Sequence, residues 1–167
     1  MDSSCSFAFF SFDMAIRKKY HIWNQAELDS MLSKGIGMLK EIDIPISQSI
    51  NPHIKVISDP YVFGLHQDRK YFEPGDDFNY EHQICISAAV LGNSEKSMMN
   101  TVLHELIHTI PGCTHDNGGK LWLEYTDKVN KYYGFNISVR NNKDMQKGDR
   151  TRVCLSLKHC MHKLSLK

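Results

Sequence analysis

The pentapeptide His-Glu-Leu-Ile-His at residues 104–108 constrains the fold more than any other feature of this chain. On an α-helix, residues four positions apart lie on one face, one turn apart, so the side chains of His104 and His108 become neighbours. The motif lies in a segment with apolar residues at helical spacing, which begins at Ser94, a natural N-cap, and reaches about Ile110. The sequence therefore predicts a helix that brings two imidazoles and a carboxylate to one place.

These three side chains are suited to a catalytic zinc site. Neutral imidazole is a good zinc ligand, and a catalytic zinc keeps an open position for water beside its three protein ligands. Glu105 directly follows the first ligand, so it can take a proton from that water without binding the metal itself. We therefore expect one catalytic Zn2+ ion, with His104 and His108 as ligands and Glu105 as general base. The alternative is a chance match between ordinary surface or core histidines.

A third protein ligand is needed, and His115 is the candidate that we favour. It is the next histidine after His108, and it follows a Pro-Gly break at 111–112 that can turn the chain back toward the helix. Asp116, beside it, and Glu124, on the next predicted helix, are rival third ligands. His115 can also be read as an exposed loop histidine.

The remaining segments predict an α+β fold with a helix before a short sheet and two helices after it. A capping box of Asn24 and Glu27 opens the first helix, which extends to about Ile42. Alternating and β-branched residues predict strands, and Pro-Gly and paired aspartates predict a surface loop. The strands are expected at 53–57, 61–65 and 81–88, the loop at 67–79, the last helix at 119–133, and a final short strand at 135–139.

The composition indicates one globular domain. The chain has 167 residues, of which 41% are hydrophobic and 23% charged, and this length is enough to bury a core. No apolar run approaches the roughly 18 residues of a membrane span, so we expect no membrane contact. The five cysteines are odd in number and widely spaced, and we find no export signal, which favours free thiols and a cytoplasmic location.

Charge is distributed unevenly along the chain. Residues 1–139 carry 12 Lys/Arg and 17 Asp/Glu, whereas residues 140–167 carry 8 Lys/Arg and 2 Asp/Glu. A basic tail is a candidate contact for the phosphates of DNA, and a DNA-linked protein would be associated with the nucleoid or nucleus. The alternative is a solvated terminal segment without a partner.

The residues around the motif resemble a known family, the SprT-like zinc metallopeptidase domain of the SprT/Spartan type. The resemblance is carried by the run 102–109, by Gly112-Cys113, and by His115, Gly119-Lys120 and Trp122. Upstream, Phe63-Gly64 and the run 83–87 resemble the strand–loop–strand segment of the family. The similarity covers roughly residues 20–140.

This resemblance implies a small zincin-like domain at 20–140, with an N-terminal helix, a short three-stranded sheet, the active-site helix and a C-terminal helix. It implies three histidine ligands to zinc, catalysis by Glu105, and a protein or peptide substrate, which in the Spartan type is DNA-associated protein. The chain departs from the family in one spacing. Counted back from Trp122, Gly118 stands where the family histidine would fall, and an insertion in this loop reconciles His115 with the pattern.

The two ends fall outside the resemblance. Residues 1–19 form an N-terminal extension that we expect to be poorly ordered. Residues 141–167 form the basic C-terminal tail, in which Cys154, His159, Cys160 and His162 resemble a degenerate remnant of the family's zinc ribbon. The alternative for the whole chain is a non-catalytic, zinc-containing nucleic-acid-binding protein.

Overall fold

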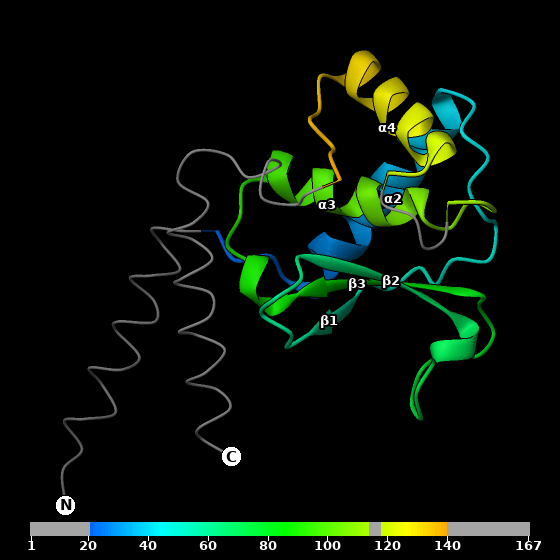
Figure 1. The fold of residues 1–167 in the computed structure, drawn as a ribbon. Helices are drawn as coiled ribbons and strands as arrows, with labels where there is room; N and C mark the ends of the chain where they lie inside the picture. The colour runs from blue at the N-terminus through cyan, green and yellow to red at the C-terminus, as the bar shows by residue number, and fades with distance from the viewer. Residues whose placement is uncertain (1–20, 114–117, 140–167) are drawn as a thin grey trace, which may run out of the picture.

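Three helices lie on one side of a three-stranded sheet in the computed structural model (Figure 1), which describes residues 21–113 and 118–139. This arrangement confirms the predicted α+β class. Helix α3 is central, because it contacts both other helices and strands β2 and β3. In chain order the elements are α2 (Gln25–Glu41), β1 (Lys55–Ile57), β2 (Gly64–Asp68), β3 (His82–Ser87), α3 (Glu95–Ile107) and α4 (Lys120–Tyr133).

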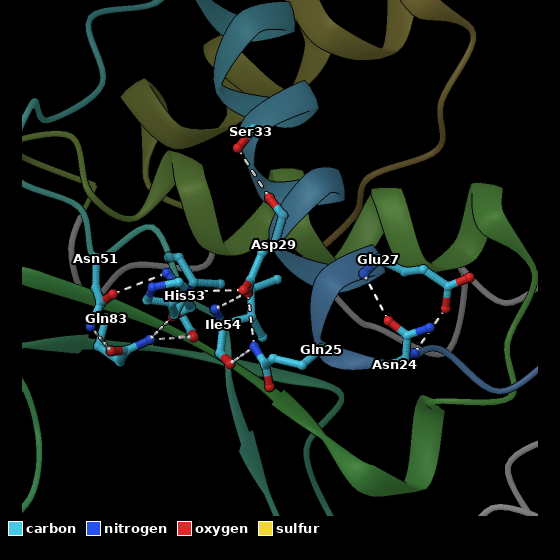
Figure 2. Close-up of polar contacts among 10 residues, drawn as sticks. Asn24, Gln25, Glu27, Asp29, Ser33, Asn51, His53, Ile54 and Gln83 are labelled. Carbon is cyan, nitrogen blue, oxygen red and sulfur yellow. Dashed lines mark hydrogen bonds and ion pairs between the residues drawn. The ribbon is translucent and has the colours of Figure 1, made fainter.

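Helix α2 begins with the capping box that the sequence predicts. The Asn24 side chain accepts a hydrogen bond from the Glu27 backbone N–H at 3.1 Å, and the Glu27 carboxylate accepts one from the Asn24 N–H at 2.9 Å (Figure 2). Each bond satisfies a backbone donor that the first turn would otherwise leave unpaired, and such a cap stabilises a helix by about 1 kcal/mol. The start of α2 is therefore determined locally.

Asp29, on the first turns of α2, ties this helix to the chain that enters β1. Its carboxylate accepts hydrogen bonds from the His53 ring at 2.8 Å, from the Ile54 N–H at 2.9 Å and from the Gln25 amide at 2.8 Å (Figure 2). Burial alone would raise the pKa of Asp29, but these hydrogen bonds outweigh it and lower the pKa. The helix layer and the sheet are thus joined by a charged hydrogen-bonded contact.

Helix α3 is almost entirely buried, and α2 approaches it closely at Gly35. A Cβ atom at that position would lie 3.0 Å from Leu106 Cδ1 and 3.4 Å from Val102 Cγ1. Glycine therefore lets the two helix backbones pack together, which offsets its low helix propensity. Ser94 caps α3 as predicted, but the α-helix ends at Ile107, earlier than predicted, because residues 108–110 bond to carbonyls three positions back.

The sheet has the order β1-β3-β2, with β1 parallel and β2 antiparallel to β3. The predicted first and third strands are confirmed in shortened form. The middle strand is displaced, since it runs over Gly64–Asp68 rather than 61–65 and so takes in polar residues that were assigned to the loop. Within β2, Gly64 and His66 are buried toward α3 while Leu65 is exposed. The polar strand is tolerated because its inward side chains have polar neighbours.

The predicted strand at 135–139 is wrong. Its backbone is held by a side chain instead of a neighbouring strand, because the Asn130 amide donates to the Ile137 carbonyl at 2.9 Å and accepts from the Ile137 N–H at 2.7 Å. Helix α4 ends as predicted at Gly134, whose φ of 68° lies in the left-handed region. Among the described residues, no helix has both the length and the apolar character needed to span a bilayer.

Candidate metal centre

His104 and His108 lie side by side at the end of α3, as their spacing predicts. Their ring centroids are 5.2 Å apart, and the side chains are buried, with residue exposures of 2% and 6%. The indole of Trp122, on α4, covers both rings, at 4.9 Å from His104 and 5.9 Å from His108. Packing of α4 against α3 thus holds the two imidazoles in the buried interior beside an aromatic side chain.

The tautomer of His108 follows from its hydrogen bond. Nδ1 lies 2.6 Å from the backbone carbonyl oxygen of Cys113. A carbonyl oxygen can only accept, so Nδ1 donates its proton and the neutral ring keeps its lone pair on Nε2. The turn that places Cys113 there requires Gly112, whose φ is +87°. This carbonyl–histidine contact is the arrangement that orients metal-binding imidazoles in proteins.

Glu105 is buried beneath strand β2. Its carboxylate accepts a hydrogen bond from the His66 backbone N–H. Desolvation raises the pKa of Glu105 to about 8, and the His66 bond opposes that rise. Gly64 leaves the space for this carboxylate, because a Cβ atom there would lie 2.8 Å from both Glu105 Cγ and Oε1. The backbone of β2 therefore determines where the Glu105 carboxylate can sit.

The described donor set fits a zinc ion at the end of α3. Two neutral imidazoles are suitable ligands, and at least one, His108, has its metal-binding nitrogen determined by a backbone contact. The carbonyl end of a helix carries partial negative charge, which favours a cation near His104 and His108. A catalytic site needs one more protein ligand than these two residues provide.

The predicted third ligand, His115, lies outside the described residues, as does its rival Asp116. The other rival, Glu124, is exposed on α4, and over residues 21–113 and 118–139 it joins no group of three potential ligands. His115 and Asp116 therefore remain predicted third ligands that the structure does not describe. The position of Glu124 does not support it as a ligand. The candidate ribbon residues in 141–167 and the basic tail are likewise outside the described part.

The structure brings together a second group that sequence reasoning missed. His66 and Asp68, on β2, and His82, on β3, place one potential ligand atom each within 4.8 Å of one another. The signal in the sequence is the His-x-Asp spacing, which puts both side chains on one face of a strand. It was missed because the strand was predicted to end at 65. Burial lowers the pKa of His82, and the nearby Asp68 carboxylate opposes that shift.

The two groups are adjacent through His66. The His66 ring is 5.0 Å from that of His82 on one side and 6.3 Å from that of His108 on the other, and it is nearly parallel to the latter, at 21°. We call His66, Asp68 and His82 the strand triad, and His104 and His108 the helix pair. A row of imidazoles thus connects the triad to the pair.

Two cysteines lie within the described residues. Cys85 and Cys113 are both buried. Burial raises the pKa of the Cys85 thiol to about 12, which keeps it protonated at neutral pH. Cys113 contributes its backbone carbonyl, which orients the His108 ring.

Comparisons with protein-family models, with curated proteins and with solved structures find no match to this chain.

Proposed function

We propose that this chain is a zinc-dependent metallopeptidase of the SprT-like type. The observation that carries the proposal is the buried helix pair with Glu105 between its members and with His108 oriented by the Cys113 carbonyl. His104 and His108 are two of the ligands, and His115 is the third. A small zincin-like domain over residues 20–140 is the architecture that goes with this function.

The zinc ion, when bound, lowers the pKa of a coordinated water and polarises the carbonyl of the scissile bond. Glu105 accepts a proton from the attacking water at a carboxylate oxygen. It then donates that proton to the nitrogen of the leaving amine, so that one residue serves as base and acid in turn. The buried position supports this role, because the backbone N–H of His66 holds the Glu105 carboxylate in place next to the first ligand.

The position of β2 favours an extended peptide as substrate. β2 lies at an edge of the three-stranded sheet, and its backbone contacts Glu105. The outer edge of a strand presents N–H and C=O groups that an extended peptide can pair with, as in strand addition. A peptide bound along β2 would lie beside Glu105 and the helix pair.

The basic tail adds a nucleic-acid contact to the proposal. Its 8 Lys/Arg against 2 Asp/Glu favour binding to a phosphate backbone, which would bring DNA-associated proteins to the active site. Deleting residues 140–167 should weaken DNA binding and reduce its dependence on salt. If the salt dependence is unchanged, the tail has no such role.

The test of the peptidase proposal is the substitution Glu105→Gln, with Glu95→Gln as the matched control. Glu95 is on the same helix, but its side chain is 64% exposed and pairs with Lys34 at the surface. We expect Glu105→Gln to keep its zinc content and to lower cleavage of an unfolded protein substrate by about 10²–10⁴-fold. Glu95→Gln should cleave like the parent. Equal cleavage by parent and Glu105→Gln would overturn the mechanism.

A further inference from the structure

We propose that the strand triad, His66, Asp68 and His82, is a second zinc site, distinct from the site at the helix pair. This inference does not depend on the peptidase proposal. It rests on the register of β2 and β3, on the distances between the three ligand atoms, and on the burial of the group.

The register brings the three side chains to one face of the sheet. His66 and Asp68 are two residues apart on β2, so both point toward the same side. Asp68 is the antiparallel partner of His82 on β3, and the side chains of such partners lie directly beside each other. Backbone pairing therefore positions the triad, and no rearrangement is needed to bring its members together.

The two distances to Asp68 match those around a tetrahedral metal ion, and the two ring nitrogens lie closer together than such ligands do. His66 Nε2 lies 2.9 Å from His82 Nδ1, and Asp68 Oδ1 lies 3.5 Å from the former and 3.4 Å from the latter. Zinc bonds of about 2.0–2.1 Å to nitrogen and oxygen separate tetrahedral ligands by about 3.3–3.4 Å. Two imidazoles and one carboxylate are also a ligand set that zinc accepts, whereas calcium and magnesium prefer oxygen alone.

The alternative is a hydrogen-bonded triad without metal. The contact of 2.9 Å between His66 and His82 is compatible with one N–H···N bond. The Asp68 oxygen, however, is nearly equidistant from both rings at 3.4–3.5 Å, which is longer than the 2.7–2.9 Å of a usual charge-assisted bond. The two distances to Asp68 are those expected of ligands around a shared cation, and the 2.9 Å contact between the two rings would open by about 0.4 Å to admit the ion.

The three side chains of the triad differ in exposure. The His66 side chain is 2% exposed, while those of His82 and Asp68 are 17% and 18% exposed. Solvent can therefore supply the fourth ligand from the outer side. On the inner side, His66 also lies against His108 and donates its backbone N–H to Glu105, so an ion at the triad would stabilise the part of β2 that positions Glu105.

The experiment measures zinc per chain after dialysis of the full-length protein against micromolar Zn2+. It compares the parent with Asp68→Asn/His82→Gln, with His104→Gln/His108→Gln, and with the control His21→Gln, whose side chain is 55% exposed. We expect the triad variant to hold one zinc fewer than the parent, the helix-pair variant to keep the triad ion, and the control to match the parent. Equal zinc in parent and triad variant overturns the proposal.

The same comparison separates the two proposals. If the helix pair binds no zinc, its variant will equal the parent while the triad variant still loses one ion, and only the peptidase proposal fails. A second measurement uses the parent protein alone, so it does not depend on whether a variant folds. Adding Zn2+ to the metal-free parent should shift the ring-nitrogen NMR signals of His66 and His82 together. Unchanged signals, or tighter binding of Fe2+ than of Zn2+, would overturn the assignment of this site to zinc.

Discussion

The helix pair and the strand triad are two candidate metal sites built in different ways. His104 and His108 belong to one helix, and their proximity follows from four residues of spacing. His66, Asp68 and His82 are divided between two strands, and 16 residues separate the two histidines in the chain. Ligand sets on one helix are therefore local, whereas ligand sets on two strands depend on a register that the intervening loop and the core determine together.

The two sites also differ in the groups beside them. The helix pair has Glu105 next to it, a carboxylate that is not among the proposed zinc ligands. In the triad, the carboxylate of Asp68 is itself one of the three potential ligands. Among the described residues, the group contains no further carboxylate that could act as a base. We therefore expect catalysis at the helix pair and a stabilising ion at the triad.

The largest expected effect is a loss of cleavage activity, which should be much greater at the helix pair than at the triad. His108→Gln removes a proposed zinc ligand, and we expect activity to fall by more than the roughly 100-fold upper range seen for residues that only support a ligand. His82→Gln should lower activity by at most about 10-fold, since it acts only through β2. Initial rates on one unfolded protein substrate, at equal folded concentration, test this. Equal losses in both variants would mean that the sites act as one.

The next effect concerns the pH dependence of stability in the metal-free protein. The pKa of Glu105 is about 8 when folded and near 4.5 when unfolded. Between these pH values Glu105 is protonated in the folded chain and ionised in the unfolded chain. The contribution of Glu105 to the free energy of unfolding therefore falls as pH rises from 4.5 to 8 and is lowest above 8. We expect Glu105→Gln to remove this loss and to be more stable than the parent at pH 8, on the order of a few kcal/mol.

Urea unfolding in the presence of a chelator at pH 5, 6.5 and 8 measures this effect. The relevant quantity is the difference between Glu105→Gln and the parent, because other titrating groups are common to both. Glu95→Gln is again the surface control. A difference that does not change with pH would show that Glu105 ionises as freely in the folded chain as in the unfolded one.

Gly64 is where the strand of the triad contacts the helix of the pair. In Gly64→Ala the new Cβ would lie 2.8 Å from Glu105 and from Thr101 Cγ2, so we expect a loss of about 1–3 kcal/mol and a displaced Glu105. Cleavage should fall together with stability. Adding Thr101→Ser removes the methyl group that clashes and should restore part of the stability. Unaltered unfolding and cleavage in Gly64→Ala would contradict the close contact.

The smallest effect compares two glycines of α2. Gly37→Ala has no atom within 4 Å of its new Cβ, so it should stabilise the protein by about 0.5–1 kcal/mol through helix propensity. Gly35→Ala places its Cβ 3.0 Å from Leu106 on α3, so packing strain should cancel this gain. Thermal unfolding of both variants tests the difference. If both are equally stabilised, Gly35 is not required by the contact with α3.

Much of the helical part of the fold could be predicted, because its signals are local. The Asn24 cap, the Ser94 cap and the Gly134 stop are each determined by a few neighbouring residues, and all three are confirmed. The strands were harder. The segment 135–139 has apolar residues suited to a strand. Its backbone N–H and C=O at Ile137 are bonded instead to the side chain of Asn130, which belongs to helix α4.

The sequence by itself determined the helix pair and the place of Glu105, because a period of 3.6 residues converts spacing into proximity without further information. Only the tertiary structure decided the environment of Glu105, since its desolvation and its contact with β2 arise from residues some forty positions earlier in the chain. The strand triad was also decided there, because the pairing of Asp68 with His82 depends on the register of two strands. Helix geometry is fixed by local hydrogen bonds, whereas strand register is set by the loop and the packing of the whole sheet.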